Sequence, residues 1–591
     1  MTITGRDFKP ERAGVAERVQ PGALGTLAAS AATTPLPPLG AIVYNRLAYG
    51  PRQGDIDSFN QLGADDTARL TAWLTAQLDG SIDDSACQAT LNNARLKIQY
   101  NAYQNSADPT KQYPALNEAR PLNYVLSTKS NDDLTRELWP LTNFGVAKDF
   151  DERMRPFEEV RVATWIRTTH SKRQLVEVLA DFWHNHFNVN GSGETQVYST
   201  FPVYDRIIRG NLLGNFRTFL EEIAKSTAMM YYLDNYNNKA GGGEGGNENY
   251  AREMFELHCF GTDNYYKFYD KRELVPKLPN SETPAGYIDK DVYQAAACLT
   301  GWTIDTTTGL FTFDGNTHDN GVKLVLNTII DLGGGAQDAT TVFDMLARHP
   351  NVAKNVCKKL VRRLIADDPP QSVIDAAAAT WMSNLDNPAQ LREVVRTIVL
   401  SNAFKTTWGQ KVKRPFDAVI AFLRATDATL PVDQLAVNGK ITDGGFWGNL
   451  FYQISGTGHK IFEWPTPTGH PDVASYWISS NSTLRRWNLP YLFTQPYGGN
   501  IVIAEWTTWN PDTETRTVTQ IVDDWIGRLF GYTIDAEARS QIIAFFAYGG
   551  SADEQPMPTA KAPDYGKSDG LKERYRSMIQ LLAASPDFHN R

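Results

Sequence analysis

Apolar residues recur at helical spacing along most of the chain. A clear example is the set Leu70, Trp73, Leu74 and Leu78, which falls on one face of a helix. Five longer segments show the same period with polar residues on the opposite face, so we expect amphipathic helices there. These segments are residues 164–187, 214–234, 247–261, 289–302 and 352–365.

The pattern changes between residues 303 and 330, where threonine, valine and phenylalanine are enriched. TGLFTFDG and VKLVLNTII predict strands that form one β-hairpin or small sheet. Strands of this kind do not alternate with the helices, which disfavours a βαβ series. The sequence therefore predicts a mainly α protein: a large multi-helix globular fold with a small β-hairpin or sheet excursion and a loop-rich C-terminal third.

Four regions follow from these patterns. Residues 1–40 are expected to be a flexible lead-in that ends in the proline-rich TTPLPPLG. Residues 41–150 form a helical N-terminal region, and residues 151–430 form the central helical core. Residues 431–591 are rich in glycine, proline and tryptophan, which predicts a loop-rich region that ends in a helix over LKERYRSMIQLLAASPDF.

Composition narrows the classes of function. Apolar residues make up 42% of the 591 residues and charged residues 21%, as in ordinary globular proteins. The net charge of -9 and the lack of a long Lys/Arg run disfavour nucleic-acid binding. No stretch of about 18 apolar residues predicts a membrane span, and the N-terminus shows no clear export signal. The four cysteines form no Cys-x-x-Cys pair, which disfavours structural zinc. They are also too few for a disulfide framework, so we expect Cys259 and Cys298 to be free, buried thiols.

The segment DFWHNHFNV places His184 and His186 after an apolar helix face. His186 follows four residues after Phe182 and points to the same buried side. If the helix continues, His184 projects roughly 160° from His186, and one ion cannot bind both. If the chain becomes extended, both imidazoles lie on one side and can share a metal. A pair of hydrogen-bonded core histidines explains the pattern equally well.

The segment NENYAREMFELHCFG carries a polar stripe of Asn249, Arg252, Glu253 and Glu256 on one helical face. A Glu-x-x-Glu pair can chelate a cation or serve as acid and base. The alternative is an exposed face on which Arg252 pairs with Glu256. His258 points away from Glu256 as long as the helix continues, which makes it a weaker candidate.

Two loops carry further polar groups. In THDNGVK, His318 and Asp319 precede an Asn-Gly turn and Lys323 lies on the next strand. They can ligate a metal, orient a base or neutralise an anion, or they can be a polar hairpin tip. In EWPTPTGHPD, His470 and Asp472 stand in a proline-rich loop that either lines a cleft or serves packing.

The order of these motifs resembles a large bacterial family catalogued as domain of unknown function 1800. The motifs span about residues 42–588 and read YNRLAYGP, FWHNHF, YLDN, NENYARE, ELHCFG, DVYQAAACLTGW, HDNGVK, HPNVAKNVCKKL, KVKRP and LLAASPDF. The resemblance implies a predominantly helical fold. Many relatives are exported through a twin-arginine signal. The genes of these relatives often lie beside a gene for a second exported protein that resembles sulfatases and phosphatases. The resemblance implies a periplasmic or extracellular protein, although a cytoplasmic protein is also compatible with this sequence. The resemblance does not imply any particular activity.

The family pattern coincides with polar residues that stand within apolar helices, where each needs a partner. These residues are His184, His186, Asn247, Glu248, Asn249, Arg252, Glu253, Glu256, His318, Asp319 and Lys323. We therefore expect a shared centre in which His184 or His186 lies beside Glu253 or Glu256, with His318 or Asp319 next to them.

Three functional hypotheses follow. The first is a metal-assisted hydrolase or oxidoreductase, in which His184, His186, Glu253 and Glu256 hold Zn, Fe or Mn. In it His318, Asp319 and Lys323 act on the substrate, with Asn249, Arg252 and His258 as further polar groups of the site. The second is a structural or binding protein that works with an exported, sulfatase-like partner. The third is a metal-free carbohydrate-active enzyme that uses two of the carboxylates, suggested by the 14 Trp and 25 Tyr. This aromatic content fits a carbohydrate or a peptide as the ligand, and the substrate itself is left open.

Overall fold

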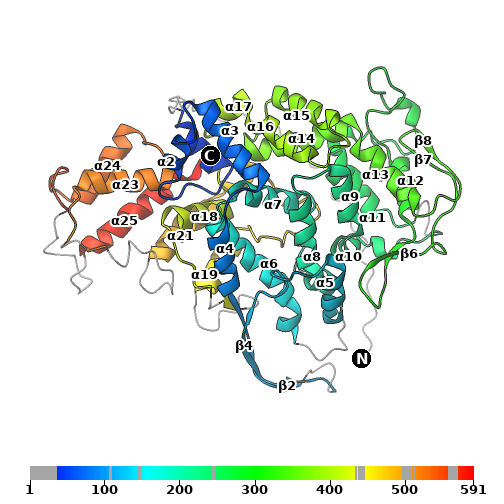
Figure 1. The fold of residues 1–591 in the computed structure, drawn as a ribbon, viewed down its shortest axis with the longest axis horizontal. Coiled ribbons are helices and arrows are strands. Elements are labelled where there is room, and N and C mark those ends of the chain that lie inside the picture. The colour runs from blue at the N-terminus through cyan, green and yellow to red at the C-terminus, as the bar shows by residue number, and fades with distance from the viewer. Residues whose placement is uncertain are drawn as a thin grey trace. The chain divides into compact units, whose positions relative to one another are not determined.

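The computed structural model describes most of the chain outside the lead-in: residues 36–104, 110–142, 149–241, 246–432, 435–436, 446–494, 509–510, 513–556 and 570–591. Pro37–Arg591 is one compact unit. Its secondary structure is mainly helical, as the sequence predicts (Figure 1). Of the predicted lead-in, only residues 36–40 are described, and helix α1 already begins at Leu39.

The N-terminal region contains four helices, a small sheet and a fifth helix. In α3, Leu70, Trp73, Leu74 and Leu78 are all buried, so the predicted helical face is confirmed. Asp65 caps this helix by accepting a hydrogen bond from the amide of Ala68 at 2.9 Å. The helices are α1 Leu39–Arg46, α2 Asp55–Asn60, α3 Asp66–Asp79, α4 Ser85–Asn93 and α5 Asn131–Leu138.

A three-stranded sheet in this region was not predicted. β1 (Arg95–Tyr100) pairs antiparallel with β4 (Leu116–Pro121) and parallel with β9 (Leu435–Ala436). Leu96 and Ile98 of β1 are fully buried and alternate with exposed or half-buried residues. RLKIQY shows that alternation in the sequence, but a pattern of only six residues does not distinguish a strand from a helix. β2 (Tyr103–Gln104) and β3 (Gln112–Tyr113) form a separate two-stranded pair.

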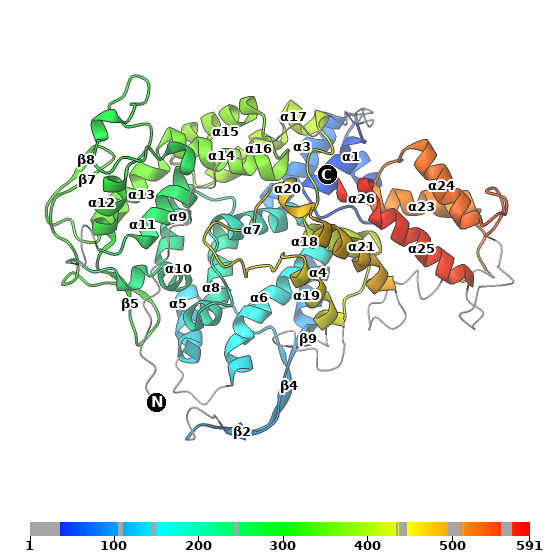
Figure 2. The same cartoon turned by 180° about the vertical axis from the view of Figure 1, so that it is seen from behind.

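The central core is built on long helices that pack on one another. Figures 1 and 2 show α6, α7 and α8 in the middle of the unit, with α23–α25 at one end and α12, β7 and β8 at the other. α6 packs on α8, while α14, α15 and α16 form a second packed group. The bounds are α6 Phe150–His170, α7 Gln174–His186, α8 Thr195–Asn211, α9 Phe216–Lys225, α10 Thr227–Tyr232, α11 Asn249–Glu253, α12 Asp289–Leu299, α13 Gln337–Ala347, α14 Pro350–Leu364, α15 Gln371–Ser383, α16 Gln390–Val399, α17 Asn402–Thr406 and α18 Pro415–Ala425.

The predicted β excursion is confirmed and consists of two hairpins. β5 (Trp302–Ile304) pairs with β6 (Phe311–Phe313), and β7 (Lys323–Val325) pairs with β8 (Thr328–Ile330). The apolar run VKLVLNTII looks like one strand, but Leu326 and Asn327 both have positive φ and make a tight turn within it. The Leu-Asn pair therefore divides the predicted strand into two short ones.

The C-terminal region combines helices with long connections. Its helices are α19 Phe446–Gly456, α20 Ala474–Trp477, α21 Ser480–Thr494, α23 Val518–Phe530, α24 Ala536–Ala547, α25 Gly570–Ala584 and α26 Pro586–His589. An extended loop between α19 and α20 crosses α7, where the side chain of Asn185 contacts the backbone of His470. Among the described residues, no helix is long and apolar enough to cross a membrane.

All four cysteines are buried and unpaired with one another, which confirms the expectation for Cys259 and Cys298. Burial raises the pKa of the Cys87 and Cys298 thiols to about 12. We predict that a thiol reagent applied to unreduced protein will count four thiols after denaturation and react only slowly before it. A count of two after denaturation would contradict the free-thiol assignment.

Candidate functional site

Helix α7 continues through both predicted histidines, so His184 and His186 point in different directions. His184 Nε2 lies 3.0 Å from Asp205 Oδ1. His186 Nε2 donates to the carbonyl oxygen of His258 at 3.1 Å. Of the two backbone conformations considered for His184 and His186, a continued helix and an extended chain, the structure shows the helix. One ion cannot bind both side chains in this arrangement.

His184 belongs to a buried network of charges between α6, α7 and α8. Arg209 contacts Asp205 at 3.0 Å and Glu177 at 3.0 Å, and Arg167 lies 3.7 Å from Asp205. Burial alone would raise the pKa of Asp205, but Arg209 and His184 hold it below its ordinary value. Each charge in this network has a partner of opposite sign, which is typical of a structural role.

The predicted helix over NENYAREMFELHCFG changes type in its middle. α11 ends at Glu253 and a π-helix follows over Met254–Cys259. The amide of Phe260 donates to the carbonyl oxygen of Phe255 at 2.8 Å, the five-residue spacing of a π-helix. π-Helical turns are rare and frequently occur at functional sites.

Side chains from two other helices bind the carbonyl oxygens at the end of this π-helix. Lys359 Nζ of α14 donates to Leu257 O at 2.7 Å, and Asn355 Nδ2 of α14 donates to Cys259 O at 2.8 Å. His186 of α7 donates to the carbonyl between them, that of His258. Three consecutive carbonyl groups are thus satisfied from outside the helix, which stabilises the wide turn.

The polar stripe on this helix is only partly paired. Arg252 contacts Glu248 at 2.5 Å and Asp289 at 3.1 Å, and does not pair with Glu256 as one alternative supposed. Asn249 donates from Nδ2 to Leu233 O at 3.3 Å.

Glu253 and Glu256 are half-buried. Within the described part of the chain, neither has a hydrogen bond or ion pair with another side chain. Burial, and next the charge of Glu256, raise the pKa of Glu253 to about 7. Arg252 lowers it, but by less. Burial, and to a smaller degree the charge of Glu253, raise the pKa of Tyr232, whose hydroxyl donates to Pro465 O at 3.1 Å. An uncompensated carboxyl pair of this kind is where acid–base chemistry or cation binding is expected.

His318 and Lys323 belong to a third cluster, beside the hairpins. His318 Nδ1 lies 2.7 Å from Thr300 O, and His318 Nε2 lies 3.2 Å from Asp338 Oδ2. Lys323 Nζ contacts the same carboxylate at 2.6 Å. His318, Lys323 and Asp338 are all buried, while Asp319 at the turn is half-buried. These groups satisfy one another, so the cluster has the character of a structural network.

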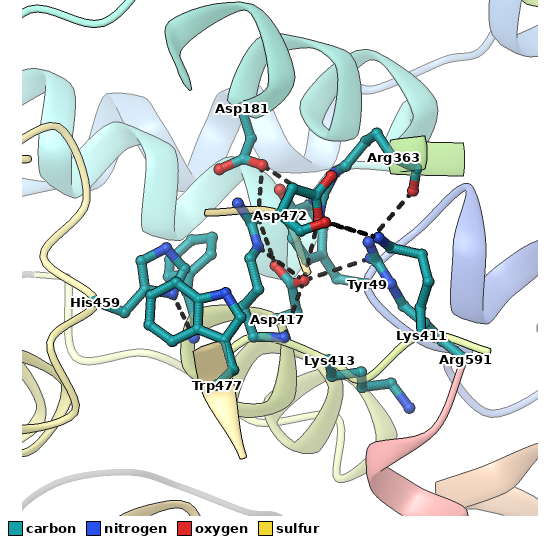
Figure 3. Close-up of polar contacts among 12 residues, drawn as sticks. Tyr49, Asp181, Arg363, Lys411, Lys413, Asp417, His459, Asp472, Trp477 and Arg591 are labelled. Atoms are coloured by element: carbon teal, nitrogen blue, oxygen red, sulfur yellow. Dashed lines mark hydrogen bonds and ion pairs between the residues drawn. The ribbon is translucent and has the colours of Figure 1, made fainter. Parts of the chain in front are cut away.

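A fourth cluster, centred on Asp417, was not predicted as a unit. Figure 3 shows Asp417 among side chains from α14, α18 and the C-terminal segment. Its carboxylate contacts Arg414 at 2.9 Å, Arg363 at 3.4 Å and Arg591 at 3.4 Å. Burial alone would raise the pKa of Asp417, but the three guanidinium groups hold it well below its ordinary value.

The same cluster reaches α7 and the loop before α20. Asp181 of α7 contacts Arg414 at 2.6 Å and Arg363 at 3.0 Å. Lys411 contacts Asp472 at 3.2 Å and Asp367 at 2.6 Å. Two segments of the sequence contribute to this cluster. One is the basic segment KVKRP, which was a motif of the family resemblance. The other is the loop with His470 and Asp472, for which lining a cleft and packing were both predicted as possible roles.

The predicted side chains have different partners. His184 pairs with Asp205, His186 donates to the carbonyl oxygen of His258, and His318 and Lys323 share Asp338, while Glu253 and Glu256 have no such partner among the described residues. In the part of the chain that is described, no three His, Cys, Asp or Glu side chains converge as ligands of one ion.

Comparison with known proteins gives one match. A family model described as "Protein of unknown function (DUF1800)" matches residues 42–590, nearly the whole chain. No curated protein and no solved structure matches it.

The Asp417 cluster predicts a large stability effect. Asp417→Asn removes the carboxylate and leaves Arg363, Arg414 and Arg591 without this partner in the interior. We expect a loss of about 3–5 kcal/mol in the free energy of unfolding, measured by chemical denaturation. Asp386→Asn is the control, because it removes an exposed ion pair with Arg348 and should cost about 1 kcal/mol at most. Equal losses in both variants would contradict the assignment.

The raised pKa of Glu253 predicts unusual reactivity. Carbodiimides react with protonated carboxyl groups, and ordinary glutamates lose that proton near pH 4.3. We expect labelling of Glu253, mapped by mass spectrometry, to persist to about pH 7 and to fade above it. The exposed Glu273 serves as the reference peptide. Labelling of Glu253 that fades together with Glu273 would show an unperturbed carboxyl.

Proposed function

The chain belongs to the DUF1800 family of proteins of unknown function, and from that premise we propose an enzyme that performs acid–base chemistry, in its simplest form hydrolysis, at Glu253 and Glu256. One observation carries the proposal. These two carboxyl groups are half-buried and unpaired within the described residues, whereas the other predicted polar groups, apart from the His258 side chain, have charged or hydrogen-bonded partners. Unpaired charge in a folded protein is costly, and it is kept where a ligand or a reaction uses it.

The pair contains both partners that hydrolysis needs. A carboxyl group with a pKa of about 7, such as Glu253, can hold a proton near neutrality and donate it to a leaving group. The charge of the neighbouring Glu256 is the second cause of that raised pKa, after burial, and we assign the Glu256 carboxylate the role of the base that accepts a proton from water. General acid or base action of this kind contributes on the order of 10²- to 10⁴-fold in rate.

A divalent ion is the alternative to a proton as counter-charge for this pair. Zn, Fe or Mn would be held by the carboxylates of Glu253 and Glu256, with the remaining positions left for water and substrate. Such an ion would supply Lewis-acid activation of bound water. Half-exposed, unpaired carboxylates suit this role, while His184 is bound to Asp205 and does not join them.

Aromatic side chains that are linked to the pair through Tyr232 support a carbohydrate as substrate. Glu253 is one of the charges that act on Tyr232, whose hydroxyl donates to Pro465 O at 3.1 Å. The adjacent Trp464 packs against Tyr476 with ring centroids 6.1 Å apart, and Tyr476 is 43% exposed. Glycoside-binding sites combine aromatic faces with two carboxyl groups.

A second candidate function is non-catalytic. The His184–Asp205 and His318–Asp338–Lys323 clusters are buried and internally paired, as expected of networks that fix helix positions. In this reading the chain is a scaffold that works with an exported, sulfatase-like partner. Both candidates are proposed to act in the periplasm or outside the cell, on the strength of the exported relatives.

The test is substitution at the pair. We expect Glu253→Gln and Glu256→Gln each to reduce turnover of chromogenic glycosides, esters or phosphate esters at least 100-fold, because glutamine keeps the shape and loses the proton exchange. The exposed Glu273→Gln is the matched control and should keep full activity. Activity restored by Mn²⁺ or Zn²⁺ after chelation identifies the metal-assisted form. Full activity in Glu253→Gln, or no turnover by any form, favours the scaffold.

A further inference from the structure

The hairpin of β7 and β8 has one closed edge and one open edge. Leu324 of β7 lies opposite Ile329 of β8, and in this register the backbone groups of both residues point away from the hairpin. The amide of Leu324 donates to Gln294 Oε1 at 3.0 Å, and its carbonyl oxygen accepts a hydrogen bond from Arg272 Nη2 at 2.7 Å. Side chains of the same chain therefore satisfy the outer edge of β7.

The outer edge of β8 has no such cover. Among the described residues, neither the amide nor the carbonyl oxygen of Ile329 has a hydrogen-bond partner. The Ile329 side chain is 65% exposed, and Leu332 just beyond the strand is 74% exposed. Figures 1 and 2 show β7 and β8 at one end of the unit. Strand edges are usually protected by charge, by proline or by a covering segment, because unpaired strand groups bind a further strand.

A cavity of about 500 Å³ adjoins this edge, because Thr328 of β8 is one of its lining residues. Cavities of roughly 300–1,000 Å³ are usual for ligand-binding sites. Leu326 and Met345 supply part of its apolar lining, and Arg348 and Lys354 supply two cationic side chains. Within the part of the chain that is described, no carboxylate lines this cavity.

The lining of the cavity has an excess of positive charge. Arg348 forms an ion pair with the exposed Asp386, but the exposed Lys354 has no ion pair with any described residue. Pro350 and Asn351, in the first turn of α14, also line the cavity, and the N-terminal end of a helix adds positive partial charge. A group with negative charge is therefore the electrostatic complement of this cavity.

We propose that β8 binds an extended peptide segment of a partner protein as an added antiparallel strand, with one acidic side chain of that segment in the cavity. The peptide residue opposite Ile329 exchanges two backbone hydrogen bonds with it and places an apolar side chain against it. Side chains alternate along a strand, so the next peptide residue, opposite Thr328, points to the cavity and pairs with Lys354. Backbone hydrogen bonds give such a complex its affinity, and the cavity gives it specificity.

A second copy of this chain fits the edge less well than a peptide does. A two-fold axis at Ile329 would pair this residue with its own counterpart and place the counterpart of Ile330 opposite Thr328. Ile330 is buried within its own copy and carries no charge, so it cannot fill the cavity. Lys354 would then stay without a partner, whereas an acidic peptide supplies one.

The probe is the peptide Thr-Val-Ile-Glu-Val-Thr with fluorescein at its N-terminus, titrated with the full chain and followed by fluorescence anisotropy. We expect saturable binding of one peptide per chain. Ile329→Pro removes the outward amide at an edge position that tolerates proline, and it should weaken binding at least 10-fold. Lys354→Glu should weaken binding to a similar degree, while Lys172→Glu, at an exposed lysine outside the site, is the matched control and should bind normally.

A charge exchange adds a measurement in which no variant has to keep the affinity of the unmodified protein. The same peptide with lysine in place of glutamate should bind Lys354→Glu more tightly than it binds the unmodified protein.

Three results would overturn the proposal. One is the absence of saturable binding of the acidic peptide. The second is equal binding of that peptide by the unmodified protein and by Lys354→Glu. The third is a dimer in analytical ultracentrifugation that Ile329→Pro converts to a monomer, because a second copy would then occupy the edge. None of these measurements depends on Glu253 or Glu256, so the peptide site and the acid–base proposal stand or fall separately.

Discussion

The pairing of ionised groups in the interior is the constraint on which the arrangement of the helices depends. Asp417 is buried with Arg363, Arg414 and Arg591 around its carboxylate, and Asp181 supplies a second negative charge to two of them. Removing charges from water is expensive, and only close partners of opposite sign repay that cost. Helices α7, α14 and α18 and the segment after α26 therefore have to meet at one point.

The same constraint separates structural groups from functional ones. His184, His318 and Lys323 looked like ligands or catalysts because they are polar residues in apolar surroundings. Each proves to have a nearby carboxylate, Asp205 or Asp338, that accounts for it. Glu253 at the end of α11, Glu256 and His258 in the π-helix, and Nδ1 of His186 are the groups for which internal pairing among the described residues gives no such account.

Local periodicity predicted much of the fold and little of the site. The spacing of Leu70, Trp73, Leu74 and Leu78 was enough to place α3, since a helix face depends only on neighbours a few residues away. The direction of His184 relative to His186 also followed from helical geometry, once the helix was known to continue. The partners could not be predicted, because Asp181 and Arg414 are 233 residues apart in sequence and meet only after folding. The π-helix was equally hidden, because NENYAREMFELHC has an ordinary α-helical pattern.

The position of Arg591 has a consequence for biosynthesis. Arg363, Arg414 and Asp417 are translated before Arg591, which completes the ion cluster. Phe588, whose carbonyl oxygen accepts a hydrogen bond from Lys413, is also translated late, 175 residues after that lysine. Until residues 586–591 have been translated, Lys413 lacks its carbonyl partner and the ion cluster is incomplete. The core can therefore condense around α6–α8 during translation, but the junction of α14 and α18 with the C-terminal segment closes only after synthesis of that segment.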